Sequence, residues 1–269
     1  MTTRTLRVGP WSVAFHGLPD ALATTLDARW GPFVSLTAAA PTLAVQVGEA
    51  PTGATLGPWA PGERYRMEPV SGGVRSYGFV VTPAGKGAFK LDLAPSEEPA
   101  ERRVENAVRL LVARLALQGG GFALHGAAVL DDRRAHVLAG PSRAGKTTAV
   151  AALGWPSLGD DFAVVLPEDG RWIAAATPFD NREAVAAGSS TGTWPLAAIW
   201  RLEQGPEGAL RRLTGPAAAA MLSACAAFPW ALPDLTEPLV QATVRCAGEV
   251  ECGVLTFALD TDLRGLLGG

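Results

Sequence analysis

The sequence predicts an α/β protein in which a mixed, twisted sheet surrounds a glycine-rich loop, with a mostly antiparallel β module ahead of it. Three observations predict this class. The first part of the chain alternates apolar and polar side chains in short runs, as half-buried strands do. A stretch with helical spacing follows. After it, a short apolar run leads directly into the glycine-rich loop and a further helix-forming segment.

Length and composition limit the possible function classes. The 269 residues are 48% hydrophobic and 18% charged, which is typical of a globular protein with one large domain or two small ones. The 23 basic and 26 acidic side chains give a net charge of −3. Because there is no basic excess to bind a phosphate backbone, we expect no nucleic-acid partner.

Cysteines and apolar runs predict the compartment. Cys225, Cys246 and Cys252 are an odd number without a C-x-x-C pair, so we expect buried, reduced thiols. Residues 1–9 lack the apolar segment of a secretory signal. The longest apolar stretch, residues 217–232, contains a proline and is too short to span a bilayer. We therefore expect a cytoplasmic protein without a membrane partner.

The predicted N-terminal module covers residues 1–95. Its clearest alternating runs are residues 42–47, 74–81 and 88–93, and turn-forming glycines and prolines separate them. No group of side chains with evident chemistry occurs in this part of the sequence. A small, mostly antiparallel β module is the expected structure.

A helix is predicted to bridge this module and the rest of the chain. Prolines and acidic side chains at residues 95–99 mark a helix start, and apolar side chains then recur at helical spacing until Gly119. The predicted helix covers residues 97–118. We assign residues 96–120 to the bridge and residues 121–269 to the second domain.

The second domain opens with a predicted β-hairpin. Residues 127–130 and 135–139 are short apolar runs joined by the polar turn 131–134. Near the C-terminus, residues 216–227 predict a helix, and residues 254–259 predict a strand that leads into a short terminal helix.

The second strand of this hairpin leads into the most informative segment, which fits G-x-x-x-x-G-K-[S/T] without a gap. Its glycines let the backbone fold around a polyphosphate, and the following helix presents its positive N-terminus. Lys146 would reach the β- and γ-phosphates, and the Thr147 hydroxyl would bind Mg²⁺. The pattern predicts a site for ATP, or another nucleoside triphosphate, with Mg²⁺. The predicted site consists of Gly140, Pro141, Ser142, Arg143, Ala144, Gly145, Lys146, Thr147 and Thr148.

One residue of this loop is unusual. Arg143 stands where glycine is common, so its backbone must still be able to surround phosphate. Its guanidinium would either contact phosphate or point to solvent, and we favour solvent.

Two adjacent acids follow the loop. Asp160 and Asp161 come fourteen residues after Lys146 and precede an apolar run. A helix of about two turns fits between them and the loop, so the pair can return beside the phosphates. One carboxylate would hold Mg²⁺ and the other would accept the proton of an attacking hydroxyl. The alternative is a turn-capping pair, which is our interpretation of Asp131 and Asp132, but the upstream loop favours function.

His125 precedes the first strand of the predicted hairpin, in the segment L-H-G-A-A-V. A single histidine is more often structural than catalytic, and the pattern alone favours the structural role. His16 and His136 have still less support for a role in catalysis.

These motifs together resemble the catalytic core of the HPr kinase/phosphorylase family, which is related to the ATP-dependent phosphoenolpyruvate carboxykinases. The resemblance rests on His125–Gly126 ahead of a strand pair, the loop 140–148, and the segment 158–161, and it covers residues 121 to about 200. With its N-terminal β-rich module, the layout is most similar to the branch found in peptide-modification gene clusters. Some members of that branch phosphorylate a serine hydroxyl of a lasso-peptide precursor.

The resemblance implies an HPr kinase-like fold for the core and a role for each motif. Lys146 and the loop would bind the phosphates, and Thr147 would help to hold the metal. Asp160 matches the general base for the substrate hydroxyl and Asp161 its metal-side partner. Because the two acids are adjacent, which one does which task stays open, and both are candidate metal ligands. His125 matches a histidine near the base and joins the candidate catalytic set.

The sequence departs from the family in two places. The glycine-rich acidic–basic run of bacterial HPr kinases is absent near residues 188–199, so neither HPr as substrate nor the reverse, phosphorolytic reaction is expected. The family's distal catalytic arginine has no secure match. Arg182 is our candidate, with Arg201 and Arg211 as rivals, and a surface salt bridge is an equal alternative for each.

The predicted function is that of an ATP- and Mg²⁺-dependent kinase. It would transfer a phosphoryl group to a hydroxyl of a peptide or small protein, and we expect this hydroxyl to belong to a serine. The expected acceptor is a lasso-peptide precursor or another ribosomally made, modified peptide. A hydroxyl-bearing metabolite is an alternative acceptor. Two alternative functions stay open. The chain could be a nucleotide-binding interaction or regulatory protein without transferase activity, or it could be a simple ATPase. The oligomeric state stays open, and a homo-oligomer is compatible with the sequence.

Overall fold

The computed structural model describes residues 2–35, 40–58, 66–179 and 191–268. The chain divides into two compact units: residues 1–112 with 228–233, and residues 113–227 with 234–269. The division falls inside the long helix α2 (Ala100–Gln118). The predicted helix 97–118 is therefore confirmed, with its start three residues later than expected.

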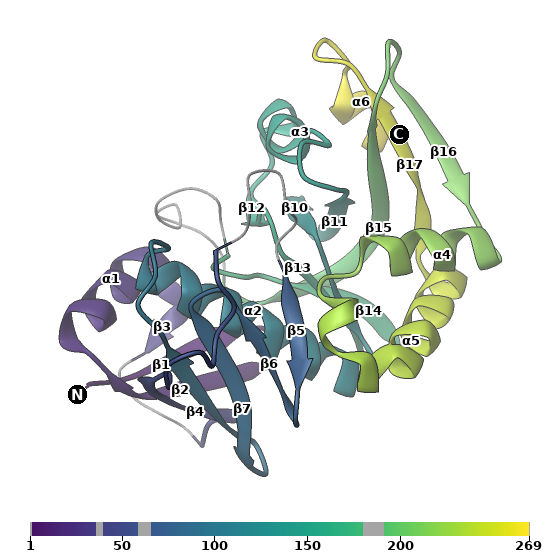
Figure 1. The fold of residues 1–269 in the computed structure, drawn as a ribbon. Helices are drawn as coiled ribbons and strands as arrows, with labels where there is room; N and C mark the ends of the chain where they lie inside the picture. The colour runs from purple at the N-terminus through teal and green to yellow at the C-terminus, as the bar shows by residue number, and fades with distance from the viewer. Residues whose placement is uncertain (1, 36–39, 59–65, 180–190, 269) are drawn as a thin grey trace. The chain divides into compact units, whose positions relative to one another are not determined.

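The first unit contains a mixed sheet in which most of the described strand pairs are antiparallel (Figure 1). Its order is β3-β1-β2-β4-β8-β7-β6-β5, and among these described strands the parallel pairs are those of β4 with β2 and with β8. The strands are β1 (Thr2–Val8), β2 (Trp11–Leu18), β3 (Val34–Ser35), β4 (Leu43–Glu49), β5 (Met67–Val70), β6 (Gly73–Ser76), β7 (Phe79–Gly85) and β8 (Ala88–Leu93). The other elements of this unit are α1 (Asp20–Trp30) and the 3₁₀ turns η1 (Gly31–Phe33) and η2 (Pro229–Ala231).

One predicted strand of this unit is wrong. Residues 74–81 form two antiparallel strands, β6 and β7, rather than one. Ser76 pairs with Phe79 across a two-residue turn, and Gly78 takes the left-handed φ of +73° that such a turn needs. The alternating pattern continues through the turn, which is why periodicity alone does not reveal it.

The second unit is built on another mixed sheet, with the order β12-β10-β11-β15-β14-β13-β9 and the pair β16–β17 beside β15. Its strands are β9 (Phe122–Leu124), β10 (Gly126–Asp131), β11 (Arg134–Ala139), β12 (Ser157–Gly159), β13 (Ala163–Glu168), β14 (Arg171–Ala175), β15 (Thr193–Gln204), β16 (Ala209–Leu213) and β17 (Glu251–Phe257). Its helices are α3 (Lys146–Leu153), α4 (Gly215–Cys225), α5 (Thr236–Glu249) and α6 (Leu263–Leu267), and the turn η3 covers Pro233–Leu235.

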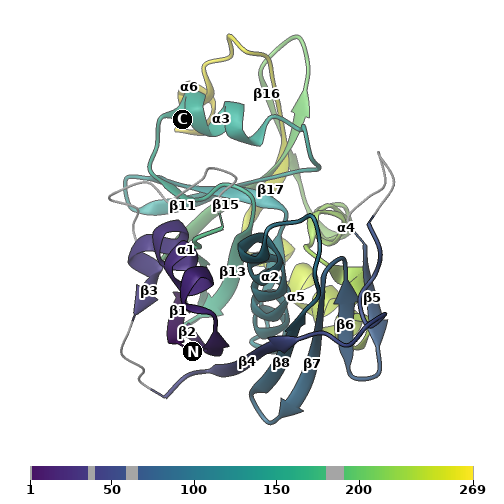
Figure 2. The ribbon, with the colours of Figure 1, turned by 60° about the vertical axis from the view of Figure 1, so that its left-hand side comes forward.

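Three parallel strands position the glycine-rich loop. The long strand β15 pairs in parallel with β11 and β17, so the carboxyl ends of all three point the same way. The loop leaves the end of β11 and leads into α3, which lies beside α6 (Figure 2). Ligand sites of α/β sheets form at the carboxyl ends of such strands.

A single apolar core holds α3 against one face of this sheet. Ala149 and Leu153 of α3 are fully buried there, and Phe257 at the end of β17 closes the core beside the loop. The buried members are Val129, Leu138, Ala144, Ala149, Leu153, Ala198, Trp200, Leu202, Leu255, Phe257 and Leu263. Burial of this kind contributes about 25 cal/mol per Å² of apolar surface, so it is the main force that fixes α3 and hence the loop.

Most of the other predicted elements of this unit are confirmed. β10 and β11 form the expected hairpin, with Val129 opposite His136. The predicted helix 216–227 is α4, which ends at Cys225 because Ala226 is extended and pairs with Leu124. The strand predicted at 254–259 is β17, which begins earlier and ends at Phe257.

Two simpler expectations concern the cysteines and the apolar stretches. All three cysteines are buried and free of disulfide bonds. Among the described residues, no helix combines the length and apolar character that crossing a membrane requires.

Candidate functional site

The glycine-rich loop has the backbone geometry that the motif requires. Gly145 caps α3 with a left-handed φ of +98°. A Cβ at this position would lie 2.7 Å from Cζ of Phe257, so the core behind the loop also excludes a side chain. Arg143 also has a positive φ of +68°, and its carbonyl accepts a hydrogen bond from the Gln204 side-chain amide at 3.0 Å. The Arg143 residue is exposed.

Lys146 lies inside the loop rather than on its surface. Its ammonium donates to the carbonyl oxygens of Gly140 and Pro141, both at 3.0 Å, and lies 3.1 Å from Nε2 of His125. Three partners match the three protons of an ammonium group. Lys146 is 7% exposed, and this burial lowers the pKa of its amine, opposed by the charges of Asp161 and then Asp160.

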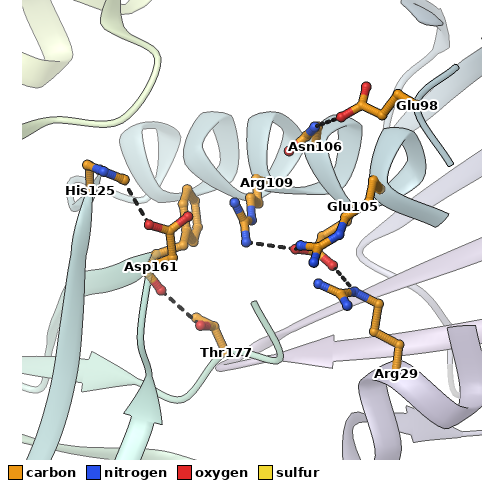
Figure 3. A network of polar contacts seen from close by, with 10 residues as sticks. Arg29, Glu98, Glu105, Asn106, Arg109, His125, Asp161 and Thr177 are labelled. Carbon is orange, nitrogen blue, oxygen red and sulfur yellow. Dashed lines mark hydrogen bonds and ion pairs between the residues drawn. The ribbon is translucent and has the colours of Figure 1, made fainter. Parts of the chain in front are cut away.

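His125 connects the loop to the acid pair. Its Nδ1 lies 3.4 Å from Oδ1 of Asp161 (Figure 3). Because Nε2 faces an ammonium donor, we assign the neutral tautomer with its proton on Nδ1, where it points to the carboxylate. The main chain fixes the same histidine: its N–H donates to Cys225 O at 2.9 Å, and its carbonyl accepts from Gly140 N at 3.0 Å.

The acid pair lies in the short connection between β12 and β13. Asp160 is 3% exposed, and the Asp161 side chain is 14% exposed. Thr177 holds both ends of this connection. Its N–H donates to Leu158 O at 2.7 Å. Its hydroxyl donates to Phe162 O at 2.8 Å (Figure 3). Both acids are therefore positioned by main-chain contacts and not only by their own side chains.

The close approach of Thr177 to this connection requires a glycine at position 159. A Cβ on Gly159 would lie 2.4 Å from the Thr177 hydroxyl oxygen, and the φ of Gly159 is +146°. Sequence reasoning did not find Thr177, because its partners are remote in the chain and no local pattern marks them. Cys225, which meets His125 through the main chain, was not found for the same reason.

The structure thus brings some predicted site residues together. Lys146, His125 and Asp161 form one chain of contacts, with Asp160 adjacent in sequence. Thr147 and Thr148 are exposed on the first turn of α3. Arg182 lies outside the described residues.

The donor set fits a magnesium nucleotide. Within the described ranges, no three His, Cys, Asp or Glu side chains gather in a way that could hold a metal by themselves. Mg²⁺ is usually held by one or two carboxylates together with substrate phosphates and water, so such a cluster is not needed. Thr147, Asp160 and Asp161 offer that kind of set beside a loop suited to phosphate.

Sequence comparison gives the family. The protein-family model described as SynChlorMet cassette protein ScmC matches residues 96–245, which is more than half of the 269 residues. The chain belongs to the ScmC family. The part of this ScmC-family chain that matches contains the glycine-rich loop, His125 and both acids.

Comparisons with solved structures and with curated sequences leave this family assignment unchanged. Among solved structures, the Hpr(Ser) kinase/phosphatase from Coxiella burnetii matches with a TM-score of 0.32 and 10% sequence identity, over 54% of the ScmC-family chain and 85% of the other. A comparison with curated protein sequences finds no significant match.

Proposed function

We propose that this ScmC-family chain is a kinase that binds ATP with Mg²⁺ and transfers the γ-phosphoryl group to a hydroxyl. One observation carries the proposal. The lysine of a gap-free phosphate-loop motif contacts His125, and His125 contacts Asp161, so the phosphate-binding element and the acid pair belong to one polar site. Loop, lysine and paired carboxylates are the groups that phosphoryl transfer needs.

The loop residues bind and orient the phosphates in this proposal. The first N–H groups of α3 have no partner within the helix and point toward the loop, where they favour an anion. Lys146 would exchange at least one of its present acceptors, Gly140 O, Pro141 O or His125, for a phosphate oxygen. Mg²⁺, held by Thr147 and one carboxylate, would neutralise charge between the β- and γ-phosphates.

The acid pair would take the proton. A bond forms between the acceptor oxygen and the γ-phosphorus, and the bond from that phosphorus to the β–γ bridging oxygen breaks, leaving ADP. The hydroxyl proton passes to a carboxylate, which we assign to Asp160, with Asp161 on the metal side. His125 would orient Asp161 through its Nδ1–H.

For the acceptor, we propose a serine hydroxyl of a peptide or small protein. The sequence resemblance to the peptide-modification branch of the HPr kinase family supports this choice. Because the family description refers to a cassette, the peptides encoded beside this chain are the first acceptors to test.

The direct experiment is transfer of radiolabelled γ-phosphate from ATP to such peptides. We expect label on the peptide with the wild-type chain, and loss of labelling in Lys146→Ala and Asp160→Asn. A matched control is Asp132→Asn, which changes an exposed acid of the hairpin turn.

The other outcomes decide among the alternatives. Tight Mg-ATP binding without any labelled acceptor would favour a nucleotide-binding regulatory protein. Acceptor-independent ADP release would point to an ATPase, and labelling of a small metabolite would replace the peptide acceptor. No nucleotide binding at all would overturn the proposal.

A further inference from the structure

A second cationic side chain lies at the edge of the glycine-rich loop. Arg201 is on β15, directly opposite Ala139 of β11, and Ala139 is the residue that precedes Gly140. Three residues further along β15, Gln204 holds the loop carbonyl of Arg143. The carboxyl-terminal part of β15 is therefore one wall of the loop, and Arg201 belongs to it.

Strand alternation decides the face on which Arg201 lies. Its neighbours Trp200 and Leu202 are in the core beneath α3. Successive side chains of a strand point to opposite faces, so Arg201 is on the other face of the sheet. Its side chain is 43% exposed there, so a ligand can reach it.

Lys146 acts on the same buried thiol as Arg201. Burial raises the pKa of the Cys225 thiol, and the positive charges of Arg201 and Lys146 act against this rise. Both cations therefore lie within electrostatic reach of one small buried group. Cys225 is itself fixed beside the site, because its carbonyl accepts the His125 N–H.

The present partner of Arg201 does not hold it firmly. Its Nη2 lies 3.5 Å from Oε1 of Glu203, and the Glu203 side chain is 42% exposed. Exposed ion pairs of this kind contribute about 0–1 kcal/mol, so a phosphate oxygen can displace the carboxylate. A guanidinium offers paired donors that match phosphate.

We propose that Arg201 contacts the γ-phosphoryl group of the bound nucleotide, as a second cation beside Lys146. The inference rests on the proposed function, because it requires a triphosphate in the loop. It makes Arg201 the residue that distinguishes ATP from ADP and that stabilises the charge of the group in transfer.

The experiment measures binding of Mg-ADP and of a magnesium complex of a non-hydrolysable ATP analogue by calorimetry. In Arg201→Gln we expect binding of the analogue to weaken by about 10- to 100-fold, as for loss of a charge-assisted hydrogen bond, with ADP binding unchanged. The loss of analogue affinity in Arg201→Lys should lie between wild type and Arg201→Gln, because lysine keeps the positive charge but lacks the paired donors of a guanidinium. A merely structural role would weaken both nucleotides equally.

Two controls complete the test. Arg171→Gln makes the same charge change at an exposed position of β14 and should leave both affinities unchanged. Glu203→Gln should leave analogue binding unchanged or tighten it, because it removes the competing carboxylate. An unchanged ratio of the two affinities in Arg201→Gln would overturn the inference. If the wild-type chain binds neither nucleotide, the proposed function itself fails.

Discussion

The ammonium of Lys146 and Nε2 of His125 lie 3.1 Å apart, so the phosphate-loop lysine is held by a side chain from outside the loop. The same histidine faces Asp161 through its other nitrogen. The contact makes His125 a competitor of phosphate for Lys146 and, at the same time, a support for the acid pair.

Replacing His125 should therefore separate binding from chemistry. In His125→Ala we expect nucleotide affinity to stay within about threefold of wild type or to improve, because Lys146 loses a competing acceptor. The rate of phosphoryl transfer should fall by about 10²-fold, since Asp161 loses its orienting donor. Calorimetry and a labelled-phosphate assay measure the two quantities. A large loss of affinity with an unchanged rate would contradict this assignment.

Gly145→Ala should reshape the loop. Its Cβ would meet Phe257 at 2.7 Å, and its φ is +98°. We expect the free energy of unfolding to fall by about 1–3 kcal/mol for the backbone and by a further 1 kcal/mol or so for the displaced ring. Gly170→Ala is the control, because Gly170 has a φ of +76° but a Cβ there would have no described atom within 4 Å apart from its chain neighbours. Equal losses in urea unfolding would show that the ring is not the constraint.

His136 predicts an acid sensitivity of the fold that does not involve the site. Its ring is buried on β11 beside Trp155, and neither ring nitrogen has a hydrogen-bond partner among the described residues. Burial lowers the pKa of His136. The charge of Asp131 raises this pKa, that of Arg134 lowers it, and that of Glu251 raises it. The His136 imidazole therefore becomes protonated at a higher pH in the unfolded chain than in the folded chain.

It follows that this histidine costs no stability above its unfolded pKa of about 6.5 and destabilises the fold as the pH falls below that value. The loss should not exceed about 1.4 kcal/mol per pH unit. Urea unfolding between pH 7 and pH 5 should show a smaller acid loss in His136→Leu than in wild type. His16→Gln, which changes an exposed histidine, should keep the wild-type slope. Parallel curves for wild type and His136→Leu would refute the prediction.

Glu105 is the charged anchor of the first unit. It is 1% exposed and binds the guanidinium groups of Arg29 and of Arg109, the latter at 2.7 Å, and Nη1 of Arg102 lies 4.0 Å from its Oε1 (Figure 3). In Glu105→Gln these arginines keep their charge without the carboxylate, so we expect about 3–5 kcal/mol of destabilisation. Glu68→Gln, which breaks the exposed pair with Arg75, should change stability by less than about 1 kcal/mol. Chemical denaturation monitored in the first unit measures both.

Local patterns were sufficient for part of the fold. The hairpin β10–β11, the loop and the two-turn helix α3 each follow from adjacent residues, and all three are present. α5 also carries a local signal, with Leu239, Ala242 and Cys246 buried at helical spacing, but the surrounding prolines and alanines concealed it. Within the first unit, α1 was likewise hidden among strand-like runs.

Remote contacts explain what the sequence could not predict. The parallel pairing of β15 with β11 and β17 joins segments separated by tens of residues, and nothing in a single strand encodes its partner. The same holds for Thr177, which clamps the acid pair, and for the contact of His125 with Lys146. The sequence indicated which residues belong to the candidate site, whereas the contacts that position those residues depend on the tertiary fold.

Magnesium-dependent nucleotide binding tests the central claim most directly. We expect the wild-type chain to bind ADP much more tightly with Mg²⁺ than without it, and Lys146→Ala to bind neither form. In Asp161→Asn the advantage given by Mg²⁺ should disappear, because Asp161 is the acid assigned to the metal. Asp160→Asn, which changes the assigned base, and Asp132→Asn should both keep it. If Mg²⁺ strengthens ADP binding in Asp161→Asn as much as in wild type, Asp161 and the loop do not share one metal–phosphate complex, and the account is wrong.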